Sequence, residues 1–195
     1  EWGGRSVAAN NELNNLTTGA CGAGTIIDHV QTFRGTDDGF EFFGGRHDVS
    51  NLYAVGNDDD NIDYSFGYDG AMQYLIIHMV GGDKGFEVDN TEDAATYTAT
   101  PRTESEIWNV TIVCGQSGTP LEKAYNYRRG ALSSINNALV IECADVFDVD
   151  DSASCNGLPG SGAAAAGRLT FGTHLVLSQT TGTTLTTSNA CGTAL

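Results

Sequence analysis

Short runs of β-branched, aliphatic and aromatic residues recur along the chain, whereas the 3.6-residue spacing of amphipathic helices is nearly absent. The runs are TIIDHV, NLYAV, QYLIIHMV, IWNVTIV, NALVIEC and HLVLS. Such runs predict strands, and the 25 glycines scattered among them are typical of turns. The runs lie farther apart than the two strands of a hairpin usually do. The pattern therefore predicts an all-β fold whose repeating unit is not the hairpin.

A second, shorter segment repeats between these runs. It reads DDGFEFFGG from Asp37, DDNIDYSFG from Asp59, DKGFEVDNT from Asp83 and, more weakly, EKAYNYRRG from Glu122. Asp59 follows Asp37 by 22 residues and Asp83 follows Asp59 by 24, while the longer step to Glu122 indicates an insertion. Periods of this size are typical of solenoids. Without helices, and without the leucine and asparagine pattern of leucine-rich repeats, the unit predicts one coil of a parallel β-helix.

Stacking these units in register predicts two columns of side chains. The inward column contains Phe40, Ile62, Phe86 and Tyr125, and the adjacent outward column contains Glu41, Asp63, Glu87 and Asn126. The longer runs are expected to share the register, with Val30, Leu52 and Ile76 aligned. Carboxylates stacked at about 4.8 Å repel one another. Solvent, cations or raised pKa values must therefore relieve the outward column.

At 195 residues the chain most simply forms one domain. We expect the β-helix to cover residues 1–178, with inserted loops near 90–106 and 144–167. The Thr/Gly-rich segment 179–195 is expected to be irregular or to cap the last coil. No apolar run is long enough to span a membrane, and Glu1 begins without a signal-peptide pattern. A mature or trimmed secreted fragment fits both observations.

The five cysteines lie far apart without a C-x-x-C pair, which argues against zinc and redox motifs and favours disulfides in an oxidising compartment. Cys143 and Cys155 are the expected pair, because the intervening ADVFDVDDSAS is interpreted as an acidic loop that a bridge would hold. The pairing of Cys21, Cys114 and Cys191 stays open.

The net charge of −16 makes nucleic acid an unlikely partner and favours divalent cations. Calcium is the expected ion and no organic cofactor is expected. GGDKGFEVD and DVDDSASCNG fit neither the calcium nonapeptide nor the EF-hand, and aspartates commonly form turns without an ion. The candidate calcium ligands are Asp37, Asp38, Asp58, Asp59, Asp60 and Asp83.

Catalysis by carboxylates is the alternative chemistry, because parallel β-helices also carry polysaccharide lyases and glycoside hydrolases. The residues of interest are Glu41, Asp63 and Glu87, with Arg102, Arg128 or Arg129 as base or substrate clamp. Only nine Lys and Arg residues are available for the basic cleft of a lyase on acidic sugars, so a non-catalytic role is favoured. Aromatic residues that strand alternation places outside the coils are candidates for stacking on sugars, but packing inside a coil or between neighbouring chains is the favoured interpretation for most of them. The residues considered are Tyr53, Tyr64, Phe66, Tyr68, Tyr74, Trp108, Tyr125 and Tyr127.

The segments NNELNNLT, DDGFEFFGG and GNDDDNIDYSFGYDGAMQYLII resemble a group of bacterial secreted or outer-membrane-anchored proteins with right-handed parallel β-helices. These proteins often occur as lipoproteins or as cell-surface proteins, and the resemblance covers roughly Glu1 to Cys143. It implies the fold and an extracellular or cell-surface location. It implies no activity, and therefore no catalytic residues.

Together these observations predict a non-catalytic structural or adhesive module of a secreted or cell-surface bacterial protein, stabilised by calcium. Uncapped coil ends expose unpaired strand edges, so a homo-oligomer or a filament formed by end-to-end stacking is expected. The alternative is a carbohydrate-active enzyme or a β-helix that binds polysaccharide. No transmembrane segment is expected.

Overall fold

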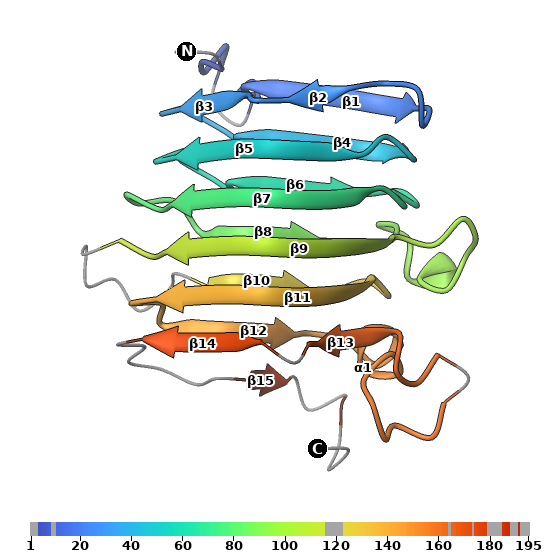
Figure 1. Cartoon of the computed structure of the whole chain (residues 1–195). Coiled ribbons are helices and arrows are strands. Elements are labelled where there is room, and N and C mark those ends of the chain that lie inside the picture. The colour runs from blue at the N-terminus through green and yellow to red at the C-terminus, as the bar shows by residue number, and fades with distance from the viewer. Residues whose placement is uncertain are drawn as a thin grey trace.

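A computed structural model of the chain describes residues 4–8, 11–115, 123–163, 165–172, 174–178, 185–187 and 191. In this part of the chain, successive strands stack as coils and form two sheets (Figure 1), and every pairing between strands is parallel. Each coil contributes a strand to each sheet. The all-β prediction with parallel coils is confirmed.

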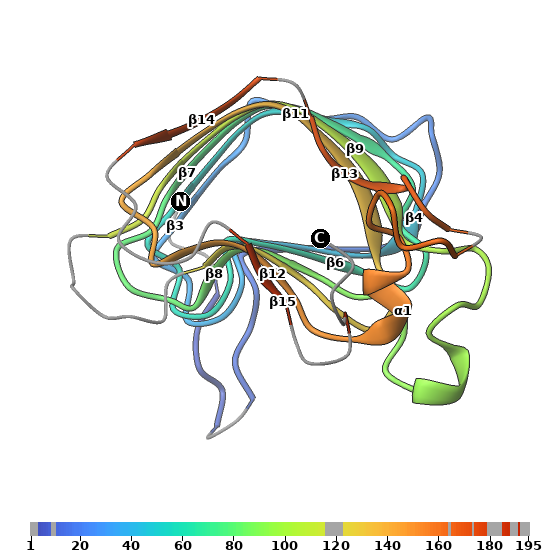
Figure 2. The ribbon, with the colours of Figure 1, turned by 90° about the horizontal axis from the view of Figure 1, so that it is seen from below.

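The seven-stranded sheet contains β1 (Leu16–Cys21), β4 (Phe40–Gly45), β6 (Ile62–Ser65), β8 (Lys84–Val88), β10 (Lys123–Tyr127), β12 (Asp145–Val149) and β15 (Leu185–Thr187). The eight-stranded sheet contains β2 (Ile27–Asp28), β3 (Gln31–Phe33), β5 (Val49–Val55), β7 (Ala71–His78), β9 (Glu104–Val113), β11 (Leu132–Ile141), β13 (Leu169–Phe171) and β14 (Leu175–Ser178). Two short helices, η1 (Ala94–Thr96) and α1 (Ser152–Cys155), lie in loops. Seen along the stack, the eight-stranded sheet arches over the flatter seven-stranded sheet (Figure 2).

The core lies between the two sheets and is built from columns of like residues. Phe40 pairs with Ile62, Ile62 with Phe86, and Phe86 with Tyr125, as the repeat predicts. The ring of Tyr125 stacks between those of Phe86 and Phe147, with centroids 5.0 Å apart on each side. Such aromatic pairs contribute about 0.5–1.5 kcal/mol each beyond the burial of their area. In-register stacking therefore turns a sequence repeat into an aromatic core.

The predicted register of the longer strands is wrong by one residue in β7. Leu52 pairs with Leu75, not with Ile76. The cause is the turn after β7: Val55 pairs with His78, but His78 lies eight residues before Phe86 whereas Val55 lies seven before Ile62. Gly81 and Gly82 lie in this longer turn with φ of 95° and 80°, which side chains with a Cβ rarely adopt. The extra residue therefore belongs to the turn and not to the strand.

A column of left-handed residues bends the eight-stranded sheet. Each of them directly precedes one of the mutually aligned residues Leu52, Leu75, Val110 and Ala138. Left-handed backbone interrupts the pleat, so the strands change direction at this corner. The residues and their φ angles are Asn51 (53°), Tyr74 (60°), Asn109 (56°) and Asn137 (53°). Asparagine tolerates this conformation better than most residues, which explains three of the four.

Two predictions about the C-terminal region are wrong. The stretch ADVFDVDDSAS is not only an acidic loop, because Asp145–Val149 forms β12 and Phe147 joins the inward column. Cys143 pairs with Cys114, and Cys155 pairs with Cys191, so the expected Cys143–Cys155 bridge is not formed. The reason is stacking: the amide of Cys114 donates to the carbonyl of Ile141, which places Cys114 beside Cys143 on the next coil.

Cys21 is a free thiol. The expected loop near 90–106 ends earlier than predicted, since β9 begins at Glu104. Most of segment 179–195 lies outside the described residues, apart from β15 and Cys191. No described helix is long and apolar enough to cross a membrane.

Candidate functional site

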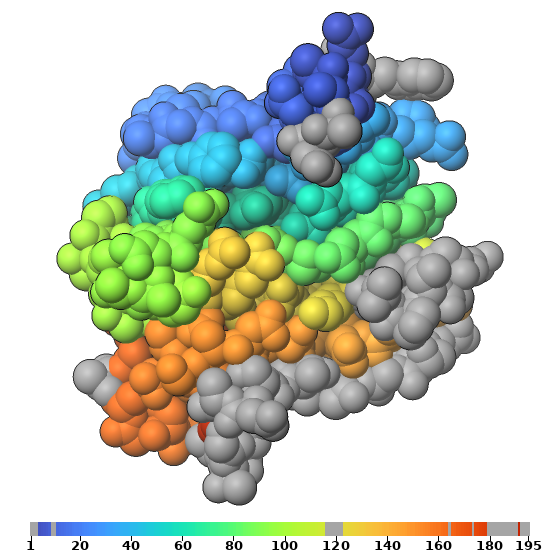
Figure 3. Space-filling model, turned by 180° about the vertical axis from the view of Figure 1, so that it is seen from behind, coloured from blue at the N-terminus to red at the C-terminus, as the bar shows by residue number. Residues whose placement is uncertain are grey.

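The outer face of the seven-stranded sheet carries the predicted column of carboxylates, and we call it the acidic face. Glu41 pairs with Asp63, Asp63 with Glu87, and Glu87 with Asn126. Asn126 in turn pairs with Asp148, so the column extends one coil further than the repeat predicts. From behind, this side of the molecule is flanked by the projecting loop around η1, in light green, and by the N-terminal segment, in dark blue (Figure 3).

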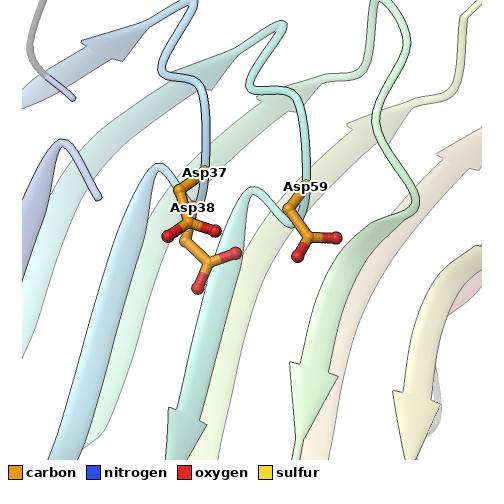
Figure 4. A group of neighbouring side chains, drawn as sticks. All are labelled: Asp37, Asp38 and Asp59. Atoms are coloured by element: carbon orange, nitrogen blue, oxygen red, sulfur yellow. The ribbon is translucent and has the colours of Figure 1, made fainter. Parts of the chain in front are cut away.

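A second column of polar side chains lies on the same face, and its residues belong to the turns that precede the strands. The backbone amide of Asp60 donates to Asp38 Oδ1 at 3.0 Å, and that of Asp38 donates to Asn14 Oδ1 at 3.2 Å. Each side chain therefore satisfies the backbone of an adjacent coil, which explains why Asp and Asn recur at this position. Asp37 and Asp38 lie before β4, and Asp59 lies before β6 on the next coil (Figure 4).

A cavity of about 110 Å³ opens on the acidic face. It is lined by the three carboxylates that the sequence singled out as catalytic candidates together with two of the three candidate arginines: Glu41, Asp63, Glu87, Arg128 and Arg129. Arg102 lies elsewhere and donates to the backbone carbonyls of Gly130 and Ala153. Arg102 therefore holds loops together and does not face these carboxylates.

The C-terminal half of the acidic face is neutralised by basic residues of the chain. Lys84 is 7 % exposed, and its Nζ lies 2.5 Å from Glu87 Oε2, 2.6 Å from Asp83 Oδ2 and 3.6 Å from Asp60 Oδ1. Arg128 contacts Glu87 and donates to Asp89 Oδ1 at 2.8 Å. One coil further on, the Nζ of Lys123 lies 2.5 Å from Asp148 Oδ2.

Arg129 adds a second cation to Asp89 at 2.7 Å. Even so, burial raises the pKa of Asp89 to about 6, against the effect of the arginine. Burial also lowers the pKa of Arg128. For Asp89 and Arg128, desolvation therefore outweighs the paired charges, whereas the carboxylates around Lys84 outweigh burial and raise its pKa.

The N-terminal half has no such cations among the described residues. Burial raises the pKa of Asp38 to about 8 and that of Glu41 to about 7. The pKa of Asp63 is also raised well above its usual range, by burial and then by the charges of Asp38 and Glu41. Solvent, cations or raised pKa values can reduce the repulsion between stacked carboxylates. In this half of the face, raised pKa values reduce it when no ion is bound.

Two carboxylate oxygens on this face are buried without a hydrogen bond, Asp60 Oδ1 and Asp63 Oδ1. Asp60 is 3 % exposed, and burial raises its pKa strongly. Buried polar atoms are rarely left unsatisfied in proteins, because each costs about 1–3 kcal/mol. Asp60 Oδ1 has the charge of Lys84 3.6 Å away, so Asp63 Oδ1 is the oxygen that marks a place where a ligand would be favourable.

The carboxylates gather into groups whose ligand oxygens lie within 4.8 Å of one another. Five of the six predicted calcium ligands belong to such groups, and Asp58 does not. Glu41, Asp63 and Glu87, which the sequence analysis assigned to catalysis, also belong to these groups. The groups are Asp37, Asp38 and Asp59; Asp38, Glu41 and Asp63; Asp59, Asp60 and Asp83; and Asp60, Asp63 and Glu87.

Sequence reasoning missed the role of Lys84. Lys84 follows Asp83 in the repeat and so stands in the column of Asp38 and Asp60. The available signal was two basic residues, Lys84 and its register partner Lys123, in the column that begins with Asp38 and Asp60.

The candidate aromatic residues separate into two sets. Tyr64, Tyr68, Tyr125 and Tyr127 are buried in the core and cannot stack on a sugar. Tyr53, Phe66, Tyr74 and Trp108 are 37 %, 48 %, 53 % and 43 % exposed. The rings of these four exposed residues therefore lie on the outside of the coils.

Comparison with known proteins gives one match. The model of a family described as a pectate-lyase like beta helix domain matches residues 1–193. No curated protein and no solved structure matches the chain.

Proposed function

The chain belongs to the pectate-lyase-like β-helix family, and we propose that it is a calcium-stabilised, non-catalytic adhesive module of an extracellular or cell-surface protein. Domains of this family are typically extracellular, and the two disulfides are consistent with an oxidising compartment. One observation carries the proposal: Asp63 Oδ1 is buried without a hydrogen bond beside the carboxylates of Asp38 and Glu41. The winding is taken as right-handed, the hand of nearly all parallel crossovers.

Calcium suits this group better than magnesium. Calcium accepts about six to eight oxygen ligands in a flexible geometry, whereas magnesium requires a near-ideal octahedron. Asp38, Glu41 and Asp63 come from a turn and two strands on adjacent coils, and their oxygens converge to within 4.8 Å. Water would complete the coordination. A bound divalent ion would replace the protons that raised pKa values otherwise keep on these groups.

A non-catalytic role is favoured by the state of Arg128. A lyase base must accept a proton, but this guanidinium contacts Glu87 and donates to Asp89 at 2.8 Å. Two carboxylates in contact favour its charged form. Burial opposes the effect of these two carboxylates on the pKa of Arg128. The contacts with Glu87 and Asp89 nevertheless give Arg128 the role of neutralising the acidic face.

Calcium titration of chelator-stripped protein, followed by thermal unfolding, tests the proposal. A ligand at 100 times its Kd adds about 2.7 kcal/mol of stability. We expect calcium to raise Tm by several degrees in the wild-type chain and in Asp58→Asn, whose carboxylate lies outside the groups. Asp63→Asn should remove the increase. An unchanged Tm in the wild type, or a full increase in Asp63→Asn, would overturn the calcium role.

Glycoside hydrolysis is the second candidate, and the cavity that contains Glu41 and Asp63 favours it. With its pKa raised to about 7, Glu41 can donate a proton near neutral pH. Close carboxylates, about 5–5.5 Å apart, are typical of retaining glycosidases. Release of reducing ends from a panel of neutral and acidic polysaccharides, lost in Glu41→Gln, would support this candidate. If the wild type releases none, it should be abandoned.

A further inference from the structure

A second groove lies on the outer face of the eight-stranded sheet, away from the acidic face. Its volume is about 450 Å³. Glu104 and Glu106 of β9 face it, together with Asp48 and Asp69 from the two preceding coils. Arg168 also lines it, but its guanidinium forms a two-pronged ion pair with Glu104. Glu104 pairs with Arg168 and Asp69 lies 3.4 Å from Arg46, so Asp48 and Glu106 are the carboxylates of the groove without an ion pair among the described residues, and they make it negative.

Trp108 stands next to this groove on the same strand. Glu106 and Trp108 are alternate residues of β9, so their side chains leave the same face about 7 Å apart. Trp108 is 43 % exposed, which is unusual for so large an apolar ring. Its register partners are Gln73 on β7 and Asn136 on β11. The indole is therefore placed between two amides with a carboxylate beside it.

This arrangement has the chemistry of a sugar site. The flat indole can stack on the apolar face of a pyranose ring, and the amides can donate to and accept from its hydroxyl groups. Glu106 is exposed and has no ion-pair or hydrogen-bond partner within the part of the chain that the structure describes. A free carboxylate beside an indole also favours an ammonium group, through charge and cation–π attraction.

We propose that the groove beside Trp108 binds a polymer of amino sugars with free amines. The ring of one sugar would stack on Trp108, and its ammonium group would lie against Glu106. A uronic acid polymer would be repelled by Asp48 and Glu106. The site names a partner for the adhesive role proposed above but uses no metal ion, so it can be tested in the presence of a chelator.

The experiment titrates the intact chain with a glucosamine tetramer in chelator, by calorimetry and by tryptophan fluorescence. We expect saturable binding that weakens with salt, and binding at least about tenfold weaker for the N-acetylated tetramer. Trp108→Ala should weaken binding by about tenfold or more, and Glu106→Gln should weaken it and reduce its dependence on salt. Tyr53→Ala and Asp58→Asn, which alter an exposed aromatic and an exposed acid elsewhere, should bind as the wild type does.

Four results would overturn the proposal: no binding, equal binding of the N-acetylated tetramer, tighter binding of a galacturonate tetramer, or full binding by a folded Trp108→Ala variant. Circular dichroism and the unfolding midpoint of each variant establish that it is folded. Asp63→Asn should lose the calcium response and still bind the glucosamine tetramer. This result distinguishes failure of the calcium site from failure of the sugar site.

Discussion

The two halves of the acidic face use the same backbone but neutralise their carboxylates differently. In the C-terminal half, Lys84 and Arg128 reach Glu87 at hydrogen-bond distance. In the N-terminal half, Asp38 and Glu41 stand in the same two columns, and no basic side chain pairs with them among the described residues. Their pKa values rise instead, to about 8 and about 7. The coils repeat the geometry, whereas the source of positive charge is decided residue by residue.

Removing the cation from the C-terminal half should have the largest effect. Arg128→Ala leaves Glu87 and Asp89 without the guanidinium that pairs with both. Breaking a fully buried pair costs about 3–5 kcal/mol, and we expect about 2–3 kcal/mol here because the Arg128 side chain is 29 % exposed. Urea unfolding measures the loss, with the exposed Arg5→Ala as control. Equal stability of the two variants would show that the halves do not differ in this way.

The same substitution should have opposite signs in the two halves. Asp38→Asn keeps an acceptor for the amide of Asp60 but removes a buried charge that has no cation, so at pH 8 without calcium it should stabilise the chain by roughly 1–2 kcal/mol. Asp148→Asn removes the partner of Lys123, 2.5 Å away, and should destabilise. Chemical unfolding of both variants provides the comparison. Changes of the same sign would contradict it.

Stability of the calcium-free chain should fall as pH rises from about 4 to about 8. The folded-state pKa values of Asp38 and Glu41, about 8 and about 7, lie above the unfolded values, so the folded state binds more protons in this window. Below the unfolded pKa values both states are protonated, so the dependence should vanish there. Unfolding midpoints across this range measure the slope. Saturating calcium should flatten it, and a midpoint that rises with pH would refute the assignment.

The smallest effect is expected from the neutral contacts of the N-terminal half. Asn14 donates to Glu41 and accepts from the amide of Asp38 at 3.2 Å. Asn14→Ala removes both hydrogen bonds and should cost about 1 kcal/mol in total, because each lies at a partly buried site and is expected at the low end of about 0.5–1.5 kcal/mol. The loss should be the same at low and high salt, whereas the loss in Arg128→Ala should depend on salt. Urea unfolding at two salt concentrations checks both, and a salt-dependent loss in Asn14→Ala would contradict this prediction.

Much of the acidic face follows from the repeat alone. Side chains alternate along a strand and parallel strands stack in register, so the spacing of Asp37, Asp59 and Asp83 predicts that Glu41, Asp63 and Glu87 are neighbours. The same reasoning fails where a turn changes length. It misses β12, whose aspartates suggested a loop although Val146, Phe147 and Val149 are buried.

The parallel coils, the inward aromatic column and the outward carboxylate column can be predicted from the repeat, because a fixed period maps positions in the chain directly onto neighbours in space. The repeat does not predict which carboxylates have a cation, which cysteines pair or which aromatic residues face solvent. The physical reason is that these properties depend on burial and on the reach of side chains between coils. Lys84 and Arg128 contact Glu87 directly, whereas neither forms an ion pair with Asp63, whose Oδ1 is buried without a hydrogen bond.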